Sequence, residues 1–160
     1  MAAVDYFLKV DGIQGESKAD DHKDEIDLES FSWGETQSGT WATGGGGTGK
    51  VSMQDFHFTM AVSKASPALF LACAEGDHIK NAILSCRKAG KPHEFMKVTM
   101  SDCLVSSFQT VGHVGGDVVP MDQISLNFAK IEVEYKEQDA AGKVLSTTKK
   151  FFDLRSYKGG

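Results

Sequence analysis

Hydrophobic and polar residues alternate with a period of two along several stretches of this chain, the pattern typical of β-strands. In residues 51–60, for example, Phe56, Phe58 and Met60 share one face, and His57 lies on the opposite face, where we expect it to be exposed. Comparable patterns predict strands at residues 4–10, 26–37, 51–60, 79–89, 95–111, 121–136 and 144–154.

The alternation changes phase within residues 121–136. Ile124, Leu126 and Phe128 share one parity, whereas Ile131, Val133 and Tyr135 share the other. This slip predicts a β-bulge near Ala129 and Lys130, or a bend that passes the strand from one sheet to another.

One helix is predicted over residues 66–75. Ser66 is a suitable N-cap, Pro67 suits the first helical position, and Gly76 can end the helix. The expected apolar side consists of Leu69, Leu71, Ala72 and Cys73. A helix this short needs tertiary support, so we expect it to pack on a sheet.

About seven strands with a single strand-helix-strand unit predict a mainly β fold. We expect a small antiparallel β-barrel of two sheets with the helix on its outside. A chain of 160 residues is long enough for one domain, which we place over residues 1–160.

Two polar regions stand out between these elements. Residues 16–25 are strongly charged without an apolar period, which predicts a solvated loop. In residues 26–37, Ser30 and Ser32 lie opposite Phe31 and Trp33, which indicates a strand with one wet face.

A glycine-rich stretch, residues 37–50, separates two predicted strands. Glycine loses more backbone freedom on ordering than any other residue, so this stretch either stays mobile or is ordered by a partner. We favour the surface of a neighbouring subunit. The residues assigned to this interface are Gln37, Gly39, Thr40, Trp41, Gly44, Gly45, Gly46, Gly47, Gly49 and Lys50.

The same stretch resembles a phosphate-binding loop, but its context is wrong. Val51 follows Lys50 where such a loop needs Ser or Thr, and a strand follows where a helix is required. We therefore expect no nucleotide and no other cofactor.

Charge and composition narrow the partners further. The net charge is -5 without a basic stripe, so nucleic acid is not expected. No apolar stretch is long enough to span a membrane, and the N-terminus lacks the pattern of a signal peptide. Cys73, Cys86 and Cys103 are widely spaced and predicted to be reduced, and no metal or catalytic motif is present.

Several segments together resemble one family over nearly the whole chain. They are residues 11–17, 22–27, 30–34, 44–50, 64–78 with Ser66 and Pro67 at the centre, 87–90 and 126–135. These segments are similar to the Hcp (haemolysin-coregulated) tube proteins of bacterial type VI secretion systems.

The resemblance implies a subunit without catalytic activity that assembles as a homohexameric ring. Such rings stack into a tube that is sheathed in the cytoplasm and expelled without a signal peptide. The implied partners are a VgrG-type spike protein, sheath and baseplate proteins, and secreted effectors held in the lumen. In a cyclic ring each subunit contacts the next through different surfaces. We therefore expect residues 37–50 to cross to the adjacent subunit or ring, and Ser30 and Ser32 to face the lumen.

Two other interpretations remain open. The chain would instead be a monomeric β-barrel that binds a small molecule, with the glycine-rich loop as its lid, or an enzyme whose site is assembled from scattered residues. A species of about six chains in solution would favour the tube protein over the monomeric barrel.

Overall fold

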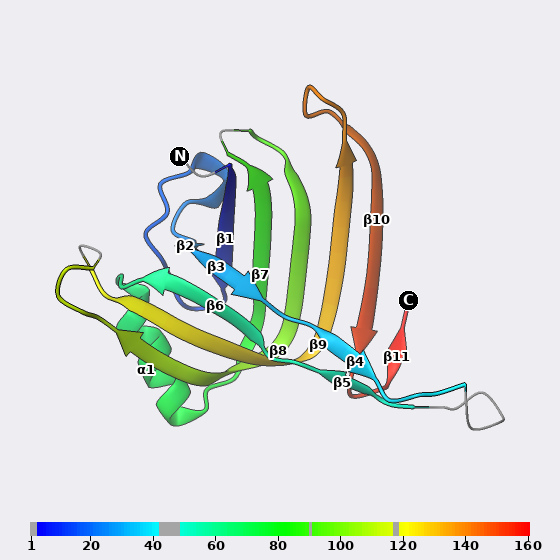
Figure 1. Ribbon diagram of the computed structural model, residues 1–160, viewed down its shortest axis with the longest axis horizontal. Helices are drawn as coiled ribbons and strands as arrows, with labels where there is room; N and C mark the ends of the chain where they lie inside the picture. The colour runs from blue at the N-terminus through cyan, green and yellow to red at the C-terminus, as the bar shows by residue number, and fades with distance from the viewer. Residues whose placement is uncertain (1–2, 42–48, 90, 117–118) are drawn as a thin grey trace.

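The structure, a computed structural model, describes residues 3–41, 49–89, 91–116 and 119–160 (Figure 1). The strands are β1 (Val4–Val10), β2 (Ile26–Asp27), β3 (Ser30–Ser32), β4 (Glu35–Gln37), β5 (Val51–Met53), β6 (Phe56–Ala61), β7 (Ile79–Lys88), β8 (Glu94–Val111), β9 (Met121–Gln138), β10 (Val144–Asp153) and β11 (Lys158–Gly159). The helices are α1 (Ala65–Glu75) and a short 3-10 helix, η1 (Asp20–His22).

Most of these strands form one large sheet of nine strands in the order β11-β10-β9-β8-β7-β1-β2, with β6 and β3 attached beside β9. All of its strand pairs are antiparallel, as predicted. Strands β4 and β5 form a separate two-stranded sheet. We call the described residues of this hairpin, 35–41 and 49–53, the ribbon.

The large sheet is open, so the prediction of a closed barrel is wrong. Of its three edge strands, β2, β3 and β11, the first two are joined by the chain itself through Leu28 and Glu29, and no ladder pairs them within the described residues. The Leu28 amide donates to the Tyr6 carbonyl and the Glu29 amide to the Thr59 carbonyl, at distances of 3.0 and 2.9 Å. Because this link runs across the gap between the two edges, it occupies the place of a closing strand pair.

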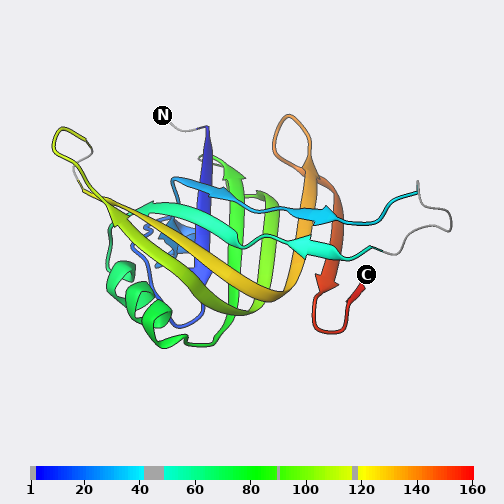
Figure 2. The same cartoon turned by 60° about the horizontal axis from the view of Figure 1, so that its bottom comes forward.

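The phase change predicted in the strand of residues 121–136 is present, but β9 stays within one sheet and changes only its neighbour there. One edge of β9 pairs with β6 over residues 121–126 and with β10 over residues 130–138. Phe128 and Ile131 are both buried although they differ in parity. Strand β8 changes phase at the same level, where Asp102 has a φ of 54° between the buried Met100 and Cys103. Both strands curve there in Figures 1 and 2.

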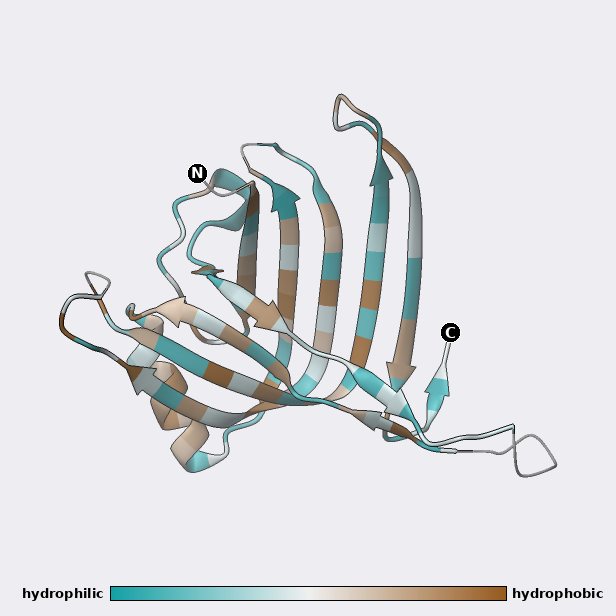
Figure 3. Cartoon of the chain, in the orientation of Figure 1, coloured by the Kyte–Doolittle hydropathy of each residue, from teal (hydrophilic) through white to brown (hydrophobic). Residues whose placement is uncertain are grey.

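The core lies on the concave side of the sheet and is built by the predicted alternation. Phe56, Phe58 and Met60 are buried and His57 is exposed. Bands of opposite hydropathy follow one another along the strands in Figure 3. Helix α1 buries Leu69 and Ala72 beside β8.

Two details of the helix differ from the prediction. Leu71 is 51% exposed, because its position on the short helix points away from the sheet. The N-cap is Lys64 rather than Ser66, which is buried one residue inside the helix. Gly76 ends the helix with a φ of 66°, as predicted.

The strands predicted at residues 26–37 and 51–60 are each interrupted. Ser32 pairs with His57 and Glu35 pairs with Met53, so three residue steps on one strand face four on the other. The extra residue is a β-bulge, which bends the hairpin and separates the ribbon from β3 and β6.

The predicted solvated loop at residues 16–25 is partly buried. His22 is 4% exposed and stacks on Phe7, with 4.4 Å between ring centroids and 8° between planes. Its Nδ1 lies 3.1 Å from Glu25 Oε1 and its Nε2 lies 3.3 Å from Glu94 Oε1. Burial raises the pKa of Glu25, although His22 opposes this shift. The sequence did not indicate this contact, because His22 stands among charged residues of the kind found in solvated loops.

Candidate functional site

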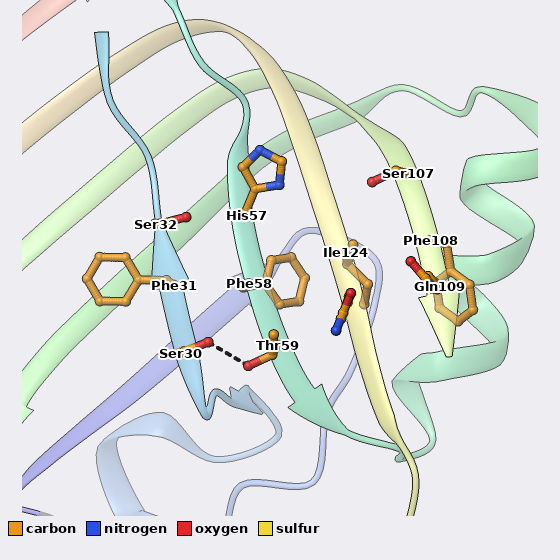
Figure 4. Close-up of a pocket in the computed structure, with 11 residues that line it drawn as sticks. Ser30, Phe31, Ser32, His57, Phe58, Thr59, Ser107, Phe108, Gln109 and Ile124 are labelled. Atoms are coloured by element: carbon orange, nitrogen blue, oxygen red, sulfur yellow. Dashed lines mark hydrogen bonds between the residues drawn. The ribbon is translucent and has the colours of Figure 1, made fainter. Parts of the chain in front are cut away.

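The two serines predicted to face the lumen lie on β3 and are exposed. Phe31, between them, is partly buried and packs against the core. Ser30 Oγ lies 2.6 Å from Thr59 Oγ1 on the neighbouring strand β6 (Figure 4). The alternation of a short strand therefore presents both hydroxyls on the face opposite the core.

This polar face continues across the sheet because the register aligns polar residues from strand to strand. One row contains Ser32, His57, Ser125 and Ser107, and the next contains Ser30, Thr59, Gln123 and Gln109. We call these eight residues the polar face. They come from four strands that are distant in sequence, so the sequence indicated only the two serines of β3.

The polar face forms most of the lining of a shallow groove of about 390 Å³ (Figure 4). His57 is the one ionisable side chain in the lining, which otherwise consists of hydroxyl, amide and apolar groups. Such a surface offers hydrogen bonds in both directions without a fixed charge. It suits contact with polar side chains or with the backbone of another polypeptide.

A cluster of hydrogen-bonded side chains lies next to this groove. Asp55 accepts hydrogen bonds from Ser106 Oγ at 2.7 Å and from Asn127 Nδ2 at 2.9 Å. The Ser125 hydroxyl contacts both Ser106 and Ser107. The two serines of β8 are adjacent in sequence and both reach the same hydroxyl because the register shifts between Val105 and Ser107. The successive serines Ser106 and Ser107 are the sequence signal for this cluster.

The ribbon is the second candidate site. Figures 1 and 2 both show it extending away from the large sheet, with β4 and β5 side by side. Ser38 Oγ accepts from the Lys50 amide at 2.9 Å, and the Gly39 amide donates to Gln37 Oε1 at 2.9 Å. Trp41 is 89% exposed.

The glycines of this segment divide into two groups. At Gly49 a side chain would collide with the Gly39 backbone, so the two edges of the ribbon approach too closely for any other residue. Gly44, Gly45, Gly46 and Gly47 lie outside the described residues. Thr40 and Lys50 are exposed on the described ends of the segment.

No group of three or more metal-ligating residues occurs in the described parts of the chain. His22, His57 and His78 lie in three separate environments: a buried stack, the polar face and an exposed ion pair. The three cysteines are free. Among the described residues, no helix has the length and apolar character needed to cross a membrane.

These features define a class of protein: a mainly antiparallel β protein with one docked helix, a polar sheet face and a projecting ribbon. The sequence model of the family described as "Type VI secretion system effector, Hcp" matches residues 7–135. The chain therefore belongs to the Hcp family of type VI secretion proteins.

Individual relatives agree with this assignment. Protein hcp1 from Pseudomonas aeruginosa strain PAO1 is 43% identical over 143 residues, which cover 88% of each chain. The crystal structure of Hcp1 from Salmonella typhimurium matches with a TM-score of 0.84 at 36% identity, covering 99% of this chain and 100% of that one. A structure described as a type six secretion system protein matches with a TM-score of 0.92 at 30% identity, with the same coverage.

Proposed function

We propose that this chain is the ring subunit of a type VI secretion tube. Six copies would close around a hollow centre, and the rings would stack into a tube that is expelled from the cell. Family membership supports the secretion role. The projecting ribbon supports assembly, because it supplies a contact surface that its own chain does not cover.

The exposure of Trp41 carries the assembly proposal. Trp41 is 89% exposed at the described end of the ribbon, whereas tryptophan side chains are highly buried on average in folded proteins. Burying one large apolar side chain stabilises by about 1.5 to 3 kcal/mol, and a closed ring repeats the contact at every interface. We assign the ribbon and the segment it carries, residues 37–50, to the contact with the adjacent subunit or ring.

The polar face is assigned to the lumen, where Ser30 and Ser32 would contact secreted effectors. A wall of hydroxyl and amide groups holds a polypeptide by several weak hydrogen bonds, each worth about 0.5 to 1.5 kcal/mol. Such contacts release the cargo readily once the ring opens or dissociates. A strongly charged wall would instead restrict the effectors to one sign of charge.

The other partners follow from the same role. A spike protein of the VgrG type would cap the tube, sheath proteins would surround it in the cytoplasm, and baseplate proteins would start its assembly. The subunit would remain in the cytoplasm before firing and leave without a signal peptide. The proposed role requires no cofactor, metal or catalytic activity.

Light scattering coupled to gel filtration tests the assembly. We expect the wild-type chain to form a species of about six copies, and Trp41→Ala to shift the population toward single chains. Leu145→Ala is a matched control, because Leu145 is 57% exposed on β10 outside the ribbon. A wild-type protein that stays monomeric, or equal losses in both variants, would contradict the proposal.

Co-purification with effectors tests the polar face. Ser32→Arg should reduce retention of an effector while ring formation persists, because the change places bulk and charge in the groove. Ser146→Arg, on exposed β10, is the control. Unchanged retention in the Ser32 variant would rule out this use of the face.

A monomeric ligand-binding protein remains the second candidate, because a groove of about 390 Å³ is large enough for a small molecule. In that function the glycine-rich segment would cover the groove as a lid. The described ends of the segment extend away from β3 and β6, which favours the assembly role (Figure 2).

A further inference from the structure

The turn between β10 and β11, residues 154–157, is held by the carboxylate of Asp153 at the end of β10. Asp153 Oδ1 accepts hydrogen bonds from the Arg155 amide at 2.8 Å and the Ser156 amide at 3.4 Å. The Arg155 guanidinium also lies 3.3 Å from Asp153 Oδ2. This arrangement closes a compact turn near the end of the chain.

The turn places Tyr157 in an unusual backbone conformation. Its φ is 56°, in the left-handed region that bulky side chains rarely adopt. Such conformations persist only where the surrounding structure enforces them. Here the Tyr157 ring meets Phe152 edge to face, with 5.1 Å between the centroids and 86° between the planes.

This conformation directs the Tyr157 hydroxyl to the middle of the ribbon, where Val51 pairs with Gln37. The Val51 amide on β5 donates a 2.7 Å hydrogen bond to Tyr157 Oη. Within the described residues the ribbon pairs with no strand of the large sheet. The Tyr157 hydroxyl therefore accepts the hydrogen bond that a neighbouring strand would otherwise accept at the edge of β5. This bond connects the ribbon to the C-terminal segment, which lies beside it in Figures 1 and 2.

A second set of contacts fixes the turn to the large sheet. Arg155 Nη1 lies 2.5 Å from Asp102 Oδ2. Asp102 stands at the bend of β8 with a φ of 54°, and its Oδ1 lies 2.8 Å from His78 Nε2. Asp102 and Tyr157 are the two described non-glycine residues in the C-terminal half with a left-handed backbone conformation. Arg155 links them, because it contacts Asp102 directly and belongs to the same turn as Tyr157.

We infer that the C-terminal turn sets the direction of the ribbon toward a second copy of this chain, with Tyr157 as the positioning residue and the Asp102–Arg155 pair as its anchor. The inference rests on the proposed role of the ribbon in assembly. If only the two segments that connect β3 to β4 and β5 to β6 held the ribbon, it could change its orientation about the bulge. The hydrogen bond at Val51 adds a third attachment away from that hinge, beyond the Glu35–Met53 pair, and so reduces the number of ribbon orientations that assembly must remove.

Tyr157→Phe tests the positioning step directly. It removes the hydroxyl and keeps the ring packed on Phe152, so the fold should persist. Hydrogen–deuterium exchange of a peptide covering residues 49–53, followed by mass spectrometry at a concentration where wild type is dissociated, should accelerate about five- to tenfold. Tyr135→Phe, which removes the hydroxyl of an exposed tyrosine on β9, is the matched control and should leave this exchange unchanged.

The assembly step has its own readout. The concentration at which half of the chains assemble should rise several-fold in Tyr157→Phe, and Arg155→Gln should shift both readouts in the same direction. Unchanged exchange in Tyr157→Phe would overturn the positioning role. Faster exchange with unchanged assembly would overturn the link to the second copy.

Trp41→Ala separates this inference from the proposed function. If Trp41→Ala abolishes assembly while Tyr157→Phe leaves it intact, the ribbon still makes the contact and the positioning inference alone is wrong. If neither variant affects assembly, the proposed role of the ribbon fails as well.

Discussion

Ser66 Oγ on α1 donates a 2.5 Å hydrogen bond to Asp122 Oδ2 on β9. Asp122 is fully buried, and its other oxygen accepts a 2.6 Å hydrogen bond from Thr110 Oγ1 on β8. The serine that the sequence indicated as a helix cap thus connects the helix to two strands of the sheet. A buried carboxylate is tolerated here because both of its oxygens have partners.

We expect Ser66→Ala to lower the free energy of unfolding by about 1 to 3 kcal/mol, because one oxygen of Asp122 loses its partner inside the protein. Urea denaturation measures this change. Ser146→Ala, at an exposed position on β10, should stay within about 0.5 kcal/mol of wild type. A Ser66 variant as stable as this control would show that the bond contributes nothing.

The buried histidine provides a second prediction. His22→Ala removes the stack on Phe7 and leaves Glu25 and Glu94 without the imidazole between them. We expect a loss of about 2 to 4 kcal/mol in the free energy of unfolding. His57→Ala, on the polar face, is the control and should change stability by less than about 0.5 kcal/mol. Similar stabilities of the two variants would mean that the packing around His22 is unimportant.

Acid should weaken the anchor of the C-terminal turn. The hydrogen bond from His78 and the contacts with Arg155 lower the pKa of Asp102 from its usual value of 3.8. Because the folded-state pKa lies below the unfolded one, the stabilisation is present above about pH 4 and is lost as the pH falls through the lowered folded-state pKa.

The difference in unfolding free energy between wild type and Asp102→Asn measures this contribution. It should shrink as the pH falls below about pH 4, through the lowered folded-state pKa of Asp102. Asp153, whose pKa is also lowered, chiefly by its hydrogen bond with Arg155, is present in both proteins and largely cancels. A difference that does not vary with pH would contradict the assignment.

The cysteines should differ in reactivity. Burial raises the pKa of the Cys86 and Cys103 thiols to about 12, so the reactive thiolate is scarce at neutral pH. Cys73 is only partly buried on α1. We expect a thiol reagent to label Cys73 in the native protein and the other two only after unfolding. Peptide mass spectrometry identifies the labelled sites, and rapid native labelling of Cys86 would disprove the expectation.

Strand positions could be predicted from sequence because each long strand has one buried and one exposed face. The alternation around Phe56 and Phe58 correctly indicated which side chains enter the core. The phase change between Phe128 and Ile131 correctly located the level at which β9 changes its neighbour. In both cases the signal is local, since every residue that produces it lies on one strand.

The errors arose where a contact joins distant parts of the chain. Charge alone made residues 16–25 look solvated, yet His22 is buried against Phe7 and Glu94. The closed barrel was expected from the number of strands, but whether a sheet closes depends on how its last edges meet. Those edges are joined by Leu28 and Glu29 rather than paired.

The sequence by itself determined the β class, the single helix, the two serines on a wet face and membership of the Hcp family, because hydrophobic period and ordered motifs are properties of the linear chain. Tertiary structure alone decided that four strands combine into one polar face, and that Tyr157 reaches Val51 across 106 residues of sequence. Strand register and the geometry of a turn bring such residues together, and neither leaves a periodic trace in the sequence.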